Sequence, residues 1–154
     1  MFAVKTNTPR MKTVYSLLAV LLFCIAPKTN AQSPHDIIGT WLSESRDGKI
    51  LIYQSGDRFF GKLIWGNKLY DEKGNQRKDL NNPDEQLKNR PLLNLIILSD
   101  FIYSDGKWKQ GHVYDPKNGK LYDAVLTLKN NQLEIRGYVG IPLFGRSTVW
   151  TRSE

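Results

Sequence analysis

The chain has 154 residues, of which 24% are charged, and a formal net charge of +7. This length corresponds to about one domain, and a single cysteine excludes a framework of internal disulfides. After residue 31, no apolar run approaches the roughly 20 residues that a membrane-spanning helix needs.

The first 31 residues have the layout of a secretory signal peptide. Lys5, Arg10 and Lys12 precede the apolar run 14–26, and a small-residue cleavage site ends at Ala31. Cleavage there leaves 123 residues and removes four basic residues and no acidic ones, which lowers the net charge from +7 to +3. A charge of +3 spread along the chain gives little reason to expect nucleic-acid binding. We therefore predict a periplasmic or secreted protein with no nucleic-acid partner and no transmembrane segment after cleavage.

Cys24 lies within the apolar run, so the cleaved chain holds no thiol for catalysis or metal binding. Its surroundings loosely resemble a lipoprotein cleavage site. Such a site needs a small residue before the cysteine, whereas Phe23 is bulky. Ordinary signal cleavage is therefore favoured over lipidation at Cys24.

Short apolar or alternating runs follow the signal, separated by turn residues about every 8 to 12 positions, a spacing typical of an all-β sandwich or barrel. Eight such runs are present. They are Thr40–Ser45, Lys49–Gln54, Arg58–Trp65, Leu95–Ser104, Trp108–Tyr114, Leu121–Leu128, Gln132–Val139 and Arg146–Arg152.

The residues between these runs favour tight turns. Arg46–Gly48, Asp105–Gly106 and Asn118–Gly119 supply the positive φ that short hairpins require, and Ser55–Asp57 and Asn130–Asn131 do so less strongly. Neighbouring runs are thus expected to pair as an antiparallel meander. Eight such strands close into a small barrel without exposed edges. We predict one domain, residues 36–154, folded as an eight-stranded antiparallel up-and-down barrel.

One connection, residues 66–94, is a long polar loop, which in a compact domain is usually functional or disordered. Within it, Asp79, Asn82 and Asp84 place several oxygens close together, as a hard cation such as calcium prefers. The spacing is not that of an EF-hand, and turn formation and helix capping explain the same residues. We predict neither a metal nor a cofactor.

The first and last predicted strands are neighbours in a closed barrel. Gly39 and Trp41 begin the first strand, and Arg152 ends the last. Stacking of this arginine on the tryptophan would close the barrel by a cation–π contact. The pattern resembles the Gly-x-Trp motif and distant arginine of lipocalins, whose role is structural.

Arg136 has two possible orientations. Leu133, Ile135 and Gly137 share one face of their strand, and Arg136 and Tyr138 share the other. If the first face is core, Arg136 faces solvent. If the second face lines the barrel, the arginine needs an acidic partner and would suit an acidic or polar ligand. The candidate partners are Asp79, Asp115 and Asp123.

The residues offer little for catalysis. The two histidines are His35, next to the cleavage site, and His112, within a strand. Neither a nucleophile elbow nor a metalloprotease motif occurs. A hydrolase that used loop carboxylates would show a strongly raised pKa at Asp79 or a neighbour. The residues therefore leave an enzymatic role open and favour a non-enzymatic one.

A series of motifs runs in order through the cleaved chain. They are Gly39-x-Trp41, Gly61–Trp65, Asp79-x-x-Asn82-Pro83-Asp84, Arg90-Pro91-Leu92, Trp108 to Tyr122 with Tyr114-Asp115-Pro116, and Arg136-Gly137-Tyr138 to Arg152 with Gly145-Arg146. This order resembles DUF2147, a family of exported bacterial proteins of unknown function. The resemblance implies a lipocalin-like, calycin-like β-barrel and carries no settled activity.

The resulting functional prediction is a barrel that binds a small or amphiphilic, lipid-like ligand. The alternative is a filled barrel that acts as a protein–protein interaction or envelope-stress module, and a carboxylate-based hydrolase is less favoured. The candidate ligand-binding residues are Trp65, Asp79, Asn82, Arg90, Tyr114, Asp115, Arg136, Tyr138 and Arg146.

Overall fold

The computed structural model describes residues 2–3 and 32–154. Except for residues 2–3, the predicted signal peptide lies outside the described residues. Cys24 also lies outside them. Residues 32–154 form one compact unit. All strands and the hydrophobic core of the described residues belong to this unit, so we expect it to fold by itself.

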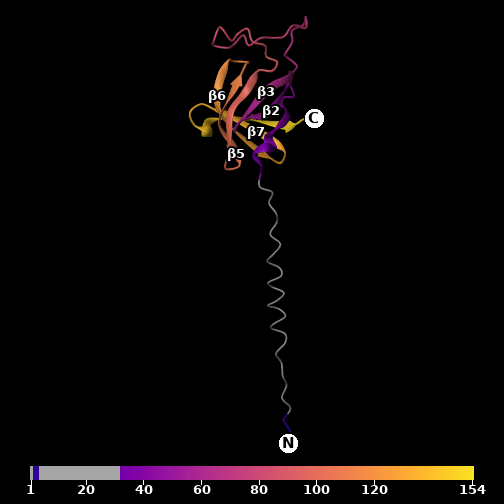
Figure 1. Cartoon of the computed structure of the whole chain (residues 1–154), viewed down its shortest axis with the longest axis vertical. Coiled ribbons are helices and arrows are strands. Elements are labelled where there is room, and N and C mark those ends of the chain that lie inside the picture. The colour runs from indigo at the N-terminus through magenta and orange to yellow at the C-terminus, as the bar shows by residue number, and fades with distance from the viewer. Residues whose placement is uncertain (1, 4–31) are drawn as a thin grey trace. The chain divides into compact units, whose positions relative to one another are not determined.

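Eight antiparallel strands close into one barrel in sequence order within residues 32–154 (Figure 1). The strands are β1 (Gly39–Leu42), β2 (Gly48–Ser55), β3 (Arg58–Gly66), β4 (Ile96–Ser104), β5 (Lys107–Asp115), β6 (Lys120–Lys129), β7 (Gln132–Tyr138) and β8 (Arg146–Arg152). Two short 3₁₀ helices accompany them: η2 (Pro34–Ile37) before β1 and η3 (Pro142–Phe144) between β7 and β8. The predicted eight-stranded up-and-down barrel is confirmed.

Turn chemistry explains the hairpins. Asp105, Asn130 and Asn131 all have positive φ, at 52°, 50° and 57°, as short antiparallel connections require. The first predicted strand ends earlier than expected, at Leu42. The reason is that the Ser43 hydroxyl accepts hydrogen bonds from the backbone N–H groups of Asp47 and Gly48, which turns the chain there.

The closure predicted between the first and last strands is confirmed. Trp41 of β1 lies opposite Arg152 of β8 in the antiparallel ladder. The guanidinium carbon of Arg152 lies 4.3 Å from the centre of the Trp41 ring. Arg152 also donates hydrogen bonds to the carbonyls of Asp36 and Ile38. This arginine therefore joins β8, β1 and the segment that begins the barrel.

One end of the barrel is filled and capped. Trp41, Phe59, Phe101 and Trp108 are almost wholly buried there, and the rings of Phe59 and Trp108 meet edge to face with centroids 6.3 Å apart. Helix η2 covers this end, because Ile37 is buried and its carbonyl accepts the Trp41 indole N–H at 2.8 Å. We call this the filled end.

The opposite end carries the longer connections. Successive turns of an antiparallel meander alternate between its two ends, so the β1–β2, β3–β4, β5–β6 and β7–β8 connections share one end. The β3–β4 connection, residues 67–95, is the long loop predicted from the sequence. It extends beyond the strands in Figure 1. We call this the open end.

Candidate functional site

The open end contains a cavity of about 1430 Å³. Its walls come from inward side chains of five strands: Leu63 of β3, Ile97 of β4, Val113 of β5, Ile135 of β7 and Trp150 of β8. The deeper part is therefore apolar. Gly137 keeps this space open, since an added Cβ would lie 3.2 Å from a Val113 methyl group.

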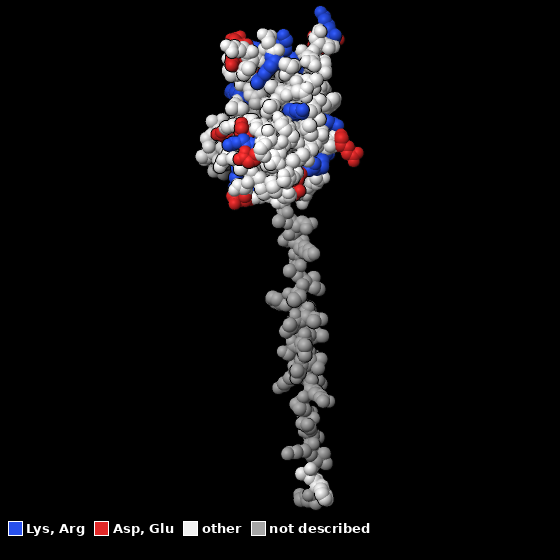
Figure 2. All heavy atoms as spheres, in the orientation of Figure 1, with Lys and Arg blue, Asp and Glu red and all other residues white. Residues whose placement is uncertain are grey.

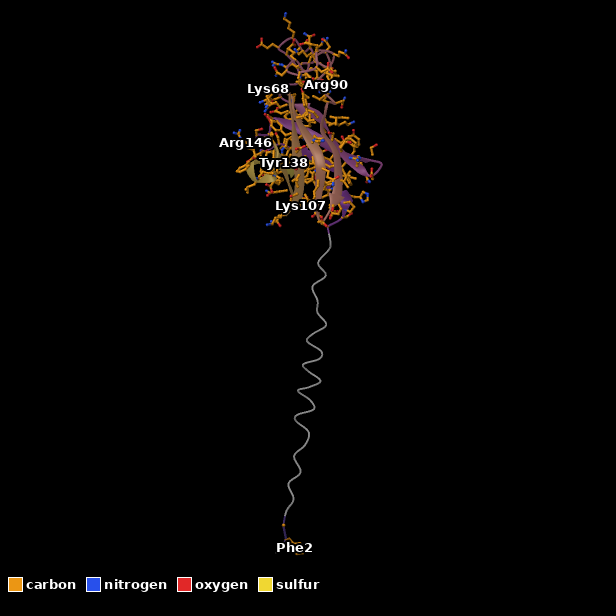
Figure 3. All side chains as sticks on the ribbon, turned by 90° about the vertical axis from the view of Figure 1, so that its left-hand side faces the viewer. Phe2, Lys68, Arg90, Lys107, Tyr138 and Arg146 are labelled. Atoms are coloured by element: carbon orange, nitrogen blue, oxygen red, sulfur yellow. The ribbon has the colours of Figure 1, made fainter. Side chains whose placement is uncertain are left out.

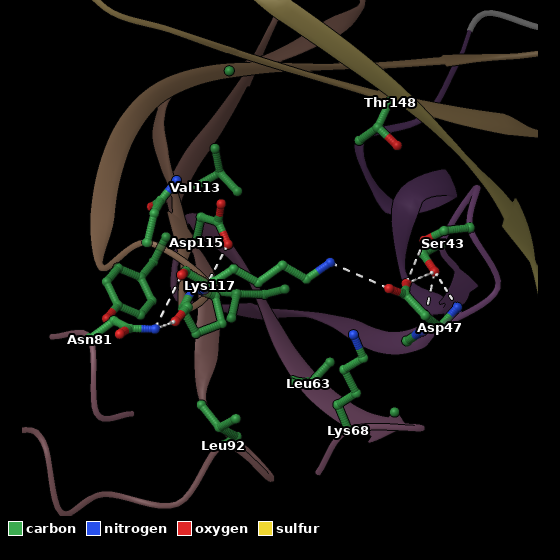
Figure 4. A pocket seen from close by; sticks show the side chains of 18 of the residues that line it. Ser43, Asp47, Leu63, Lys68, Asn81, Leu92, Val113, Asp115, Lys117 and Thr148 are labelled. Atoms are coloured by element: carbon green, nitrogen blue, oxygen red, sulfur yellow. Dashed lines mark hydrogen bonds and ion pairs between the residues drawn. The ribbon is translucent and has the colours of Figure 1, made fainter. Parts of the chain in front are cut away.

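Charged side chains surround the mouth of the cavity. Five basic and three acidic residues line it. They are Lys68, Arg77, Lys78, Lys117 and Arg146, together with Asp47, Asp71 and Asp115. Lys117, from the β5–β6 turn, reaches Asp47 of the β1–β2 connection at 3.3 Å. Figure 4 shows Lys68 pointing toward the same part of the rim.

Asp47 is held as a carboxylate. Hydrogen bonds from Ser45 and then Ser43, with the charge of Lys117, lower its pKa from 3.8 to about 2 against the opposing effect of burial. The rim therefore carries a fixed negative charge beside Lys117 across the whole physiological pH range.

Four of the predicted site residues meet in a cluster that joins the long loop to β5. The Tyr114 hydroxyl donates to Asp79 at 2.7 Å and accepts from the Asn82 amide at 3.0 Å. Asn82 also donates to Asp79 at 2.9 Å, and the Arg90 guanidinium binds the same carboxylate at 2.8 Å and lies over the Tyr114 ring. We call these four residues the loop anchor.

The anchor is internally satisfied. Burial raises the pKa of Asp79, but hydrogen bonds from Asn82, Tyr114 and Arg90 and the charge of Arg90 outweigh it, so the pKa lies below its usual value. A carboxylate acid catalyst would need the opposite shift. The amide nitrogen of Asn82 also faces Asp79, an arrangement that suits structure rather than cation binding. Among the described residues, no group of three or more His, Cys, Asp or Glu side chains could hold a metal ion.

Arg136 faces outward. Leu133 and Ile135, on the opposite face of β7, are buried. The guanidinium donates to the carbonyls of Pro142 and Leu143 at 2.8 and 3.0 Å and to the Ser147 hydroxyl at 3.0 Å. Of its two possible orientations the structure shows the solvent-side one, and its partners are the β7–β8 connection rather than an aspartate.

The remaining candidates divide between the cavity and the surface. Asp115, Tyr138 and Arg146 line the cavity, as does Tyr114 of the loop anchor. Trp65 lies on the outer surface, 46% exposed, and is not among the lining residues. The candidate set therefore separates into a cavity group, a loop anchor and two outward residues, Trp65 and Arg136. Their ligand-binding roles stay predictions.

The cavity also uses residues that were not singled out from the sequence. Leu63, Ile97, Val113 and Trp150 form its walls, and Lys68 and Lys117 stand at its rim. The wall positions follow from strand alternation once hairpin register is known. The rim lysines lie in loops, where no periodic pattern marks them.

Basic and acidic side chains are interspersed over the described face shown in Figure 2. No helix among residues 2–3 and 32–154 is long and apolar enough to cross a bilayer. The expectation that nucleic acid is not a partner stays a prediction.

Comparisons with known proteins address the fold and the family. The family model DUF2147, described as an uncharacterized protein conserved in bacteria, matches residues 39–152. A solved structure of protein HP1028 from the human pathogen Helicobacter pylori, described as belonging to the lipocalin family, is similar with a TM-score of 0.64. Its sequence is 23% identical, and the match covers 76% of this chain and 82% of that one. No curated protein matches the chain. The predicted lipocalin-like barrel is confirmed.

Proposed function

This chain belongs to the DUF2147 family of bacterial proteins, and we propose that its barrel binds a small or amphiphilic ligand in the open-end cavity. The observation that carries the proposal is the cavity itself, about 1430 Å³ with apolar walls. Ligand pockets of roughly 300–1,000 Å³ already enclose most of a small molecule. The lipocalin-like fold supports the same function by analogy.

The division of the cavity into apolar walls and a charged rim favours an amphiphile. An apolar tail would lie against Leu63, Val113 and Ile135, where burial contributes about 25 cal/mol per Å². A polar group would remain at the rim, where basic residues outnumber acidic ones by five to three. The long loop, fixed by its anchor, would form one side of the entrance.

Intrinsic fluorescence tests this proposal, because Trp150 lies in the cavity wall. Its indole N–H has no hydrogen-bond partner among the described residues, so Trp150→Phe removes the reporter without removing a hydrogen bond. We expect titration of residues 32–154 with hexadecanoate to change the fluorescence saturably and Trp150→Phe to abolish most of the change. Calorimetry should show that this variant still binds.

A pair of matched variants of β4 separates the cavity from the outer surface. Ile97→Phe fills part of the cavity and should weaken hexadecanoate binding at least about tenfold, a loss equal to 1.4 kcal/mol. Ile102→Phe, outside the lining residues on the same strand, should leave the affinity unchanged. Equal affinities for the two variants would contradict the proposal. So would the following pair of results: protein from its own host's envelope whose native mass never exceeds its denatured mass, and no binding of added hexadecanoate.

The proposal includes export to the periplasm or beyond, on the basis of the predicted signal in residues 1–31. Envelope fractionation of the host tests it directly.

The alternative function is a barrel that acts through its surface. It is supported by a different feature, the exposed apolar connection between β7 and β8.

A further inference from the structure

The β7–β8 connection presents large apolar side chains to solvent. Val139, Ile141, Leu143 and Phe144 are 77%, 52%, 75% and 78% exposed. Scattered exposed apolar residues need no explanation, but four within six positions concentrate exposed apolar side chains in one short connection. We call residues 139–144 the apolar loop.

The loop is held in this shape by the rest of the protein. Arg136 binds the carbonyls of Pro142 and Leu143 and the hydroxyl of Ser147, and the Gly145 N–H donates to the Pro142 carbonyl at 3.0 Å. These contacts fix the backbone of the loop in a conformation that leaves the side chains of Leu143 and Phe144 exposed.

The apolar loop is continuous with the cavity. Val139 and Phe144 belong both to the exposed patch and to the residues that line the cavity. The apolar loop and the walls formed by Ile135 and Trp150 therefore border the same cavity.

The charges nearest to the loop along the chain are basic. No acidic residue occurs between residues 135 and 153, whereas Arg136 and Arg146 flank the loop on either side. In the barrel, two acidic residues lie near the ends of the loop: Asp123 is opposite Tyr138, and the Glu44 carboxylate accepts hydrogen bonds from Thr148 and Val149. Arg146 also lines the cavity mouth, where five basic side chains outnumber three acidic ones. Figure 3 shows Arg146 beside Tyr138 on one side of the barrel. Apolar side chains flanked by cations are the combination that attaches proteins to anionic lipid surfaces.

We propose that the apolar loop inserts into the headgroup region of an anionic phospholipid bilayer and holds the cavity mouth against the membrane surface. A second copy of the chain is a poorer occupant, because four apolar side chains are far fewer than the roughly 20–30 residues per partner that stable interfaces use. This inference goes beyond ligand binding and does not depend on it.

Co-sedimentation with vesicles tests the proposal. Residues 32–154 are mixed with vesicles of phosphatidylcholine, with and without phosphatidylglycerol. We expect sedimentation with the anionic vesicles and little with the neutral ones. Leu143→Ser combined with Phe144→Ser should lower the partition coefficient by roughly tenfold or more, because both apolar side chains are lost. Arg146→Gln should lower it by roughly fivefold on anionic vesicles only.

The matched control is Ile96→Ser. Ile96 is 46% exposed at the start of β4, which lies across the closed barrel from β8, so its replacement should leave vesicle binding unchanged. Circular dichroism checks that each variant keeps its strands. Failure of the parent protein to sediment, or equal sedimentation of the parent and the double variant, would overturn the proposal. Light scattering that shows a dimer which the double variant disperses would assign the loop to a second copy instead.

Discussion

Asp79 is the residue on which the position of the long loop most depends. It is fully buried and binds three side chains from sequence separations of 3, 11 and 35 residues. A buried carboxylate is tolerated only with such partners, and here each partner also gains its own acceptor. The loop is therefore fixed against β5 by polar contacts rather than by an extended apolar core.

Asp79→Ala should destabilise the protein by about 3 kcal/mol, because it leaves Arg90, Asn82 and the Tyr114 hydroxyl without their acceptor. Tyr114→Phe removes one hydroxyl and leaves the other two contacts to Asp79, so about 1 kcal/mol is expected. Urea unfolding of residues 32–154 measures both. Equal costs for the two variants would contradict the central role of Asp79.

Asp47 makes stability depend on pH in a defined interval. Its pKa is about 2 in the folded protein against 3.8 in the absence of its partners. A lowered folded-state pKa contributes stability above the unfolded value, and this contribution is lost as the pH falls from about 4 to about 2. Ser45→Ala removes the largest cause of the shift. The difference in unfolding free energy between parent and variant should be larger at about pH 5 than at about pH 2, and a constant difference would be evidence against this assignment.

The sequence identified the residues of the loop anchor, but it did not predict what these residues do. Motif resemblance selected Asp79, Asn82, Arg90 and Tyr114 together, and the structure brings all four into contact. Their distribution between loop and strand gave no means of predicting that they bind one another. Strand alternation predicted that Arg136 lies on the face of β7 opposite to Leu133 and Ile135. Only the folded barrel showed that Leu133 and Ile135 face the core and that Arg136 therefore faces outward.

Among the elements, the β7–β8 connection depends most on a single side chain. The Arg136 guanidinium binds two carbonyls of η3 and the Ser147 hydroxyl at the start of β8. Since arginine supplies several donors in a rigid fork, one residue replaces the hydrogen bonds that a longer helix would make internally.

Arg136→Ala should loosen this connection locally. The three hydrogen bonds of Arg136 lie at the surface, so the global cost is expected to be only about 1 kcal/mol. Amide hydrogen exchange over residues 139–147 should accelerate clearly, while β2 and β3 keep their protection. Arg136→Lys retains the charge without the fork and should resemble the alanine variant. Unchanged exchange in both variants would show that the loop is fixed by other contacts.

Turn chemistry made the order of elements predictable and left their ends less certain. Gly and Asx residues at the short hairpins coincide with positive φ in the structure, so the strand order followed from local signals alone. The early end of β1 depends on one hydroxyl, that of Ser43, binding backbone N–H groups four and five residues away. A polar residue within an alternating run carries no mark of such a contact.

At the scale of the whole molecule, each of the two predicted barrels describes one end. The filled barrel describes the filled end, and the ligand cavity describes the open end. Trp41, Trp108 and Phe101 fill one half, and the space bounded by Val113 and Ile135 occupies the other. Composition predicted many aromatic residues in strands, but their position along the barrel axis depends on strand register. The division into two halves therefore required the three-dimensional structure.

The seam between β1 and β8 is the shortest in the barrel. Only two residue pairs join these strands, Trp41 with Arg152 and Leu42 with Thr151, whereas β7 and β8 share six. A barrel that opens along this seam exposes an edge on both strands. Closure of the whole molecule thus relies on side chains in addition to the backbone ladder.

Arg152→Ala should therefore weaken the barrel as a unit. It removes the cation–π contact with Trp41 and the hydrogen bonds to Asp36, Ile38 and Asn131, with an expected cost of about 2 kcal/mol. Because β1 carries Trp41 into the core, the loss should appear in every probe of unfolding at once, in both tryptophan fluorescence and circular dichroism. Thr151→Ala, at the neighbouring pair, keeps its backbone contacts and should cost less than about 0.5 kcal/mol. A cost for Arg152→Ala no larger than that of its neighbour would mean that the backbone ladder alone closes the barrel.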